Sequence, residues 1–103
     1  MQENRFLIAE NPLAGINANT YLIHNEDPFI MAQAFVLDKE DKDTIEELSQ
    51  AFEFNQEISY GDEHIFLGIE FMAMENIEEN QELINQILTD MIDWYCEVLD
   101  AQN

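Results

Sequence analysis

EENQELINQILTDMIDWYCEVLDA, residues 78–101, is the segment with the strongest pattern in the chain, because its apolar residues recur at the spacing of an α-helix. At about 100° per residue, these side chains fall on one broad face, which is made by Ile84, Ile87, Leu88, Met91, Tyr95, Val98 and Leu99. Carboxylates fall on the opposite face, at Glu79, Glu82, Asp90, Asp93, Glu97 and Asp100. The pattern predicts a long amphipathic helix over 78–101 that covers an apolar surface made by the rest of the chain.

Shorter segments upstream of this helix predict four β-strands, at 5–9, 20–23, 29–37 and 64–72. The third segment is apolar at every position except Gln33. Such a run favours burial on both faces, as in a central strand or a strand at a dimer contact. Turn residues at 25–28 join the second and third segments, which predicts a hairpin.

The fourth strand and the helix before it are predicted from local spacing. Alternation predicts the strand, through Ile65, Leu67, Ile69 and Phe71. Gly68 lies inside this strand and indicates a bulge or a close approach of another group to the backbone. Further upstream, Thr44-Ile45-Glu46-Glu47 has the form of a capping box, in which the Thr44 side chain accepts from a free backbone N–H. Apolar residues follow at helical spacing, so a short amphipathic helix is predicted over 44–54.

These elements predict one α+β domain over residues 1–103, with a small, mainly antiparallel sheet of about four strands packed by a short helix and a long C-terminal helix. The single cysteine, Cys96, excludes an internal disulfide and fits a small apolar residue in a reducing compartment. The N-terminal residues lack the features of a signal peptide, and no apolar run reaches the roughly 20 residues that span a bilayer. We therefore expect a cytoplasmic protein.

The net charge is the most unusual property of the chain. Twenty-three Asp and Glu residues stand against three basic ones, Arg5, Lys39 and Lys42, and the formal net charge is −20. Most carboxylates therefore lack a cationic partner and repel one another, which destabilises the compact state. Direct binding to nucleic acid or to an anionic membrane is disfavoured, because contacts with phosphate come mostly from Lys and Arg. One explanation of the charge is that it keeps the protein soluble. A second is that it attracts a basic surface on another protein.

No motif in the sequence predicts catalysis, a cofactor or a metal site. The acidic run that starts at Asp38 superficially suggests a calcium loop, but its sixth and twelfth positions are Asp43 and Ser49, where an EF-hand needs Gly and Glu. His24 and His64 lack the spacing of metal ligands and are interpreted as surface or strand-end residues. The carboxylates around Cys96 disfavour the thiolate that a nucleophile requires. We expect a protein without enzymatic activity, cofactor or metal.

The row of carboxylates on the C-terminal helix predicts a function. Neighbours in the row lie roughly 4.5–6 Å apart along the helix axis, apart from the gap between Glu82 and Asp90, where Gln86 sits. DNA presents one charge per about 3.4 Å on each strand. A typical solvated face alternates charges of both signs, but this face has no Lys or Arg. The pattern predicts a non-enzymatic inhibitor that imitates nucleic acid and binds a basic nucleic-acid-binding protein or nuclease, as anti-restriction, anti-CRISPR or immunity proteins do. The predicted contacts are this row and a second patch, at Asp38, Glu40, Asp41, Asp43, Glu46 and Glu47.

Residues 29–102 also resemble the small acidic chaperones of type III secretion and their relatives. The resemblance rests on the order of three segments, which are TIEELSQAFEFN at 44–55, IFLGIEF at 65–71 and a long amphipathic helix with a late Trp94. It implies an α+β homodimer that binds segments of effector proteins and hydrolyses nothing. In this alternative, strand 29–37 and the helix edge near Trp94 form a dimer or client surface. In a third alternative, the charge reflects a habitat of high salt.

Overall fold

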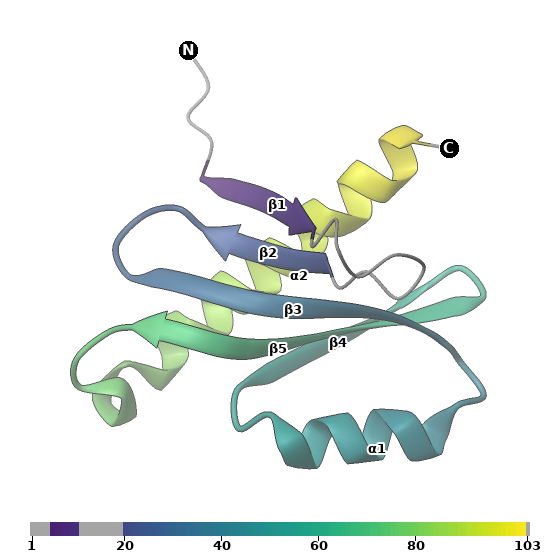
Figure 1. Ribbon diagram of the computed structural model, residues 1–103, viewed down its shortest axis with the longest axis horizontal. Helices are drawn as coiled ribbons and strands as arrows, with labels where there is room; N and C mark the ends of the chain where they lie inside the picture. Colours follow the sequence, from purple (N-terminus) through teal and green to yellow (C-terminus); the bar gives the residue numbers. More distant parts are fainter. Residues whose placement is uncertain (1–4, 11–19, 103) are drawn as a thin grey trace.

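The computed structural model describes residues 5–10 and 20–102, which form an antiparallel sheet and two α-helices (Figure 1). The strands are β1 (Phe6–Glu10), β2 (Thr20–His24), β3 (Phe29–Asp38), β4 (Asn55–Tyr60) and β5 (Glu63–Ala73). The helices are α1 (Lys42–Ala51) and α2 (Gln81–Gln102), and a short 3₁₀ turn, η2 (Ile77–Asn80), leads into α2. The predicted α+β class is confirmed, with five strands in the sheet instead of four.

Strand β3 lies in the middle of the sheet, whose strand order is β1-β2-β3-β5-β4. It pairs with β2 from Thr20↔Ala34 to His24↔Ile30 and with β5 along its whole length, always antiparallel. Both backbone edges of β3 are therefore occupied between Ile30 and Ala34. The prediction of a central strand is confirmed, and the predicted hairpin is the β2–β3 pair.

The strand that the sequence analysis did not predict is β4, whose sequence does not alternate clearly between apolar and polar residues. In NQEISY only the last three positions place apolar side chains two residues apart, at Ile58 and Tyr60. The strand forms because it pairs with β5 at the edge of the sheet through a tight turn at Gly61, whose φ is +58°. Two side chains also tie it to α2: the amide of Gln56 donates to Thr89 Oγ1 at 2.7 Å, and the Tyr60 hydroxyl donates to Asp100 at 2.6 Å.

Helix α1 begins earlier than predicted, and the predicted cap at Thr44 is wrong. Its N-cap is Asp41, whose carboxylate accepts from the Thr44 backbone N–H at 3.3 Å. A carboxylate is among the most favourable N-cap groups, so Asp41 satisfies the free N–H three residues later and Thr44 lies within the first turn. The helix ends at Ala51 rather than near residue 54, because Phe52 has an extended backbone and its N–H still bonds to Leu48.

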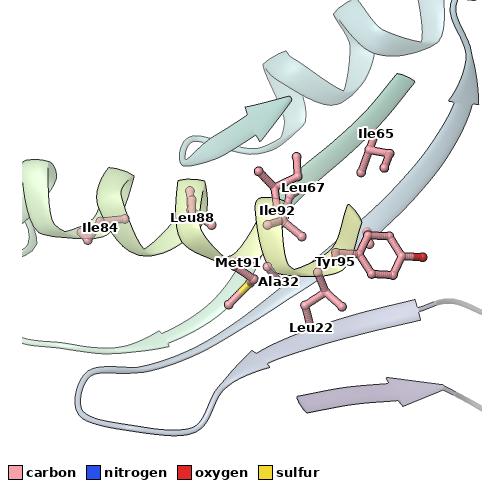
Figure 2. Packing of buried hydrophobic residues seen from close by; sticks show 10 residues of the cluster. Leu22, Ala32, Ile65, Leu67, Ile84, Leu88, Met91, Ile92 and Tyr95 are labelled. Carbon is pink, nitrogen blue, oxygen red and sulfur yellow. The ribbon is translucent and has the colours of Figure 1, made fainter. Parts of the chain in front are cut away.

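Helix α2 covers one face of the sheet, and the main apolar core lies between them (Figure 2). Five residues of the predicted apolar stripe are buried: Ile84, Ile87, Leu88, Met91 and Tyr95. Val98 and Leu99 are half-buried, and Ile92, which the stripe did not include, is buried in the core as well. Leu22, Ala32, Ile65 and Leu67 face α2 from β2, β3 and β5. Burying a side chain of this size stabilises the fold by about 1.5–3 kcal/mol.

On the opposite face of the sheet, three aromatic rings pack together near the connection between α1 and β4. The centroids of Phe35, Phe52 and Phe66 lie 5.9–6.1 Å apart. The Phe52 ring lies directly over Gly68, where a Cβ atom would approach Phe52 Cγ to 2.4 Å. The close approach predicted from Gly68 is confirmed, and the bulge in β5 lies beyond this glycine instead.

Candidate functional site

The outer face of α2 carries the acidic row, which we define as Glu79, Glu82, Asp90, Asp93, Glu97 and Asp100. Glu79 belongs to η2 and the other five to α2. All are exposed except Asp90, which is half-buried on the flank of the helix. Because the opposite stripe of α2 is buried against the sheet, the row lies on the outer side and the flanks of the helix. The helix contains no Lys or Arg, so no cation on α2 neutralises the row.

Two members of the acidic row have partners within the fold. Asp90 binds the Arg5 guanidinium at 3.2 Å and accepts from the Gln86 amide at 3.0 Å. Asp100 accepts from the Tyr60 hydroxyl. The carboxylates of the other four members, Glu79, Glu82, Asp93 and Glu97, make no hydrogen bond or ion pair with any residue in 5–10 or 20–102. These four are the members best placed to meet an external cation.

Arg5 joins the start of β1 to β2 and α2. Besides Asp90, its guanidinium meets Glu26 Oε1 at 3.3 Å and His24 Nε2 at 3.3 Å. His24 is buried at the end of β2, as a strand-end residue, and its Nδ1 lies 2.7 Å from the Pro28 carbonyl oxygen. Because a carbonyl only accepts, Nδ1 carries the hydrogen, and Nε2 is free to accept from Arg5. The cluster fixes one flank of α2 to the sheet.

Replacing Arg5 with methionine is expected to lower the free energy of unfolding by up to about 1 kcal/mol at low ionic strength, because the pairs are partly exposed. Methionine keeps most of the apolar stem and removes the charge. Lys39→Met is the matched control, since it removes one positive charge but no ion pair in the described part of the chain. Urea unfolding followed by circular dichroism measures both. An equal loss in the two variants would show that net charge, and not the pairing of Arg5, accounts for the effect.

The second predicted patch lies around the start of α1. Its six carboxylates are all exposed, at the end of β3, in the turn and on α1. Asp38 accepts from the Glu40 backbone N–H at 3.1 Å, and Asp41 caps α1, so these two have local structural roles. In Figure 1, α2 runs behind the sheet and α1 lies along its lower edge. The second patch is therefore not a continuation of the acidic row on α2.

A β-bulge in β5 changes which way Phe71 points. Ala32 of β3 pairs with Ile69, and Met31 pairs with Phe71, so Glu70 is an extra residue on β5. Ile69 and Met72 pack against the core under α2. Phe71 therefore lies on the opposite face, where its side chain is 52% exposed. Alternation in the sequence groups Phe71 with Ile65, Leu67 and Ile69, and no local signal marks the bulge.

We call the part of this second face that carries no described helix the open face. It is made by side chains of β1, β2, β3 and β5, which alternate with those under α2: Leu7, Tyr21, Ile23, Phe29, Met31 and Phe71. Leu7, Phe29 and Phe71 are 36%, 37% and 52% exposed. Phe29 and Phe71 pack edge to face, with centroids 6.2 Å apart. Exposed apolar side chains that are grouped in this way are typical of interaction surfaces.

Trp94, which the adaptor alternative places at a dimer or client surface, packs inside the fold. Its ring lies 5.5 Å from that of Phe6 on β1, at a tilt of 42°, and is half-buried. Phe6 in turn contacts the His24 ring. Strand β1 therefore covers much of the helix edge near Trp94. The adaptor alternative stays a prediction, for which the open face offers the better client surface.

Cys96 is the single thiol of the chain. Cys96 is half-buried beside the core, and burial raises the pKa of its thiol, with the carboxylates of Asp93 and Asp100 adding to the effect. The thiolate is therefore rare at neutral pH. Over residues 5–10 and 20–102, no three His, Cys, Asp or Glu side chains come together where they could hold a metal ion. In the same ranges, neither helix combines the length and the apolar character that a bilayer span requires.

No protein-family model, curated protein or solved structure matches this chain. The assignment of function therefore rests on the charges, exposures and contacts of the described residues.

Proposed function

We propose that this protein is a non-enzymatic binding protein that inhibits a basic nucleic-acid-binding protein or nuclease by presenting the acidic row of α2 in place of nucleic acid. The observation that carries the proposal is the unmixed charge of one rigid helix face. Four carboxylates of the row have no partner in the described residues, and α2 supplies no cation. The proposal places the complex in the cytoplasm.

The rigidity of the row supports this proposal. Five of its six members sit on one helix whose opposite stripe is buried, so their spacing does not depend on a flexible loop. A partner that binds phosphates would therefore meet preorganised charges and lose little freedom on ordering them. Each carboxylate also adds to the net charge of −20, which steers a basic partner towards the protein over long distances. Binding should be fast and should weaken steeply with salt.

The first experiment is affinity capture from a cell lysate with the tagged protein at low ionic strength, followed by elution with a salt gradient. The proposal predicts that a nucleic-acid-binding protein elutes at moderate salt and that added DNA competes for it. If no basic protein is retained, or if the captured protein stays bound at high salt and ignores DNA, the proposal fails.

Neutralising Asp93 and Glu97 together tests whether the acidic row is the surface that binds the captured partner. The double variant Asp93→Asn, Glu97→Gln is expected to weaken binding of the captured partner at least about tenfold, equivalent to about 1.4 kcal/mol, mainly through slower association. Both carboxylates are exposed and lack partners in the described residues, so the fold should be unaffected. The affinity and the association rate are measured at several salt concentrations.

The matched control is Glu53→Gln with Glu57→Gln, which removes the same charge from two exposed positions. Glu57 pairs with Phe66, so its side chain lies on the face of the sheet opposite α2. This control should reduce the affinity much less, through the change in net charge alone. Equal losses in the two double variants would show that the partner senses total charge and not the row on α2.

A further inference from the structure

In the described part of the chain, the open face groups exposed apolar side chains that do not belong to the core under α2. Its most exposed members, Phe29 and Phe71, come from neighbouring strands and pack against each other rather than under a helix. The β-bulge at Glu70 is what brings Phe71 to this face. Without the extra residue, Phe71 would share the face of Ile69 and be covered by α2. The bulge thus exposes a phenyl ring that the regular alternation would bury, and bulges often redirect a side chain towards a functional surface.

The same end of the sheet carries two open hollows, of which the smaller is lined by Phe29 and the larger adjoins the smaller. A hollow of about 310 Å³ is lined by Phe29, Ala73 and the turn residues Asn25, Glu26 and Asp27. A larger one, of about 650 Å³, is lined by Asp27, Pro28, Ala73, Met74, Glu75, Asn80 and Leu83. The two hollows share Asp27 and Ala73, and Ala73 is the register partner of Phe29. An apolar centre is therefore bordered by polar recesses.

The charges in these recesses are negative. Glu26 is paired with Arg5, but Asp27 and Glu75 meet no cation within the ranges 5–10 and 20–102. A partner that covers Phe29 and Phe71 must therefore place positive charge beside them, since a neutral or acidic rim would leave these carboxylates desolvated or repelled. A second copy of this chain would bring its own charge of −20 to the contact. Anionic membranes are repelled for the same reason.

We propose that the open face binds a cationic amphipathic segment of another protein. The apolar side chains of that segment cover Phe29 and Phe71, and its Lys or Arg side chains reach Asp27 and Glu75. The Phe29–Phe71 pair lies on the face of the sheet opposite α2 (Figure 1), and only the hollow beside Glu75 reaches the start of α2, at Leu83. The inference does not rest on the function proposed for the acidic row. Binding through the open face has an apolar component, whereas binding through the acidic row is electrostatic.

The test uses two synthetic peptides of equal length and equal positive charge. One places leucine on one face of a helix and lysine on the other, and its partner peptide has serine in place of each leucine. We expect the leucine peptide to bind at least about tenfold more tightly, with a difference that persists at high ionic strength because it is apolar. Amide chemical shifts should change around Phe29, Met31 and Phe71, and at the start of α2 near Leu83, which lines the hollow beside Glu75. They should not change around Asp93 and Glu97 of the acidic row.

Phe71→Ser is expected to abolish most of this difference between the peptides. The side chain is more than half exposed, so the variant should fold, and its thermal unfolding checks this. Val36→Ser is the matched control, since Val36 is 42% exposed and lies near the far end of β3 from Phe29. The inference is overturned if both peptides bind equally, if Val36→Ser has the same effect, or if the shifts lie around Asp93 and Glu97. It is also overturned if the protein is a dimer that Phe71→Ser dissociates, because a second copy then occupies the face.

Discussion

Replacing Leu88 with alanine is expected to lower the free energy of unfolding by about 2–5 kcal/mol. The Leu88 side chain is fully buried between α2 and the sheet, where it lies among Leu67, Ile92 and Ile84 (Figure 2). Truncation removes apolar contacts and leaves a cavity that the surrounding strands cannot fill without moving. A domain of this size has a total stability of about 5–15 kcal/mol. Urea unfolding of both proteins at high ionic strength, where repulsion between carboxylates is screened, measures the difference.

Leu83→Ala provides the control for this experiment, because it makes the same chemical change on the same helix. Leu83 is 45% exposed, so its truncation should alter the stability by no more than about 0.5 kcal/mol. Similar losses for Leu83 and Leu88 would contradict the packing of α2, because they would mean that the two leucines have the same surroundings. The pair therefore tests which face of the helix meets the sheet.

Replacing Gly68 with alanine is expected to destabilise the protein by about 1–3 kcal/mol. A glycine within a strand normally costs about 0.5–1 kcal/mol relative to alanine, so the opposite sign would be expected from conformational entropy alone. Here the new Cβ would lie 2.4 Å from Phe52 Cγ and 2.6 Å from Cδ1. Cγ is the atom that attaches the ring to the side chain, so rotation of the ring cannot relieve the contact. Chemical denaturation reports the size and the sign of the change.

A double-mutant cycle with Phe52→Ala isolates this contact. In the Phe52→Ala background there is no ring over position 68, and Gly68→Ala should become neutral or stabilising. A loss that remains in that background would place the cause in the sheet backbone and not in the Phe52 ring. The cycle also tests the packing of Phe35, Phe52 and Phe66, which holds the end of α1 against the sheet.

Several features of this protein follow from residues that are close together in the chain. The apolar stripe of α2 is predicted from spacing along one helix, and five of its seven residues are buried. The nearly unbroken apolar run of β3 predicts its central position, and Gly68 predicts the close approach of another group. The composition alone establishes the charge of −20, from which the proposed role of the acidic row derives. The stripe of α2 and the run of β3 depend on which side chains avoid water, and the pattern of apolar residues reports that directly. The charge is a count of residues, and the close approach at Gly68 depends on one residue without a side chain.

Other features depend on pairing between segments that lie far apart in the chain. Strand β4 exists because β5 and α2 offer it partners, which its own residues do not reveal. The pairing of Asp90 with Arg5 joins residues 85 positions apart and removes one carboxylate from the free part of the acidic row. The exposure of Phe71 depends on the register between β3 and β5. One extra residue on β5 turns the side chains that follow it to the opposite face of the sheet. Alternation along a single strand cannot show this, because a bulge is defined only by the strand opposite.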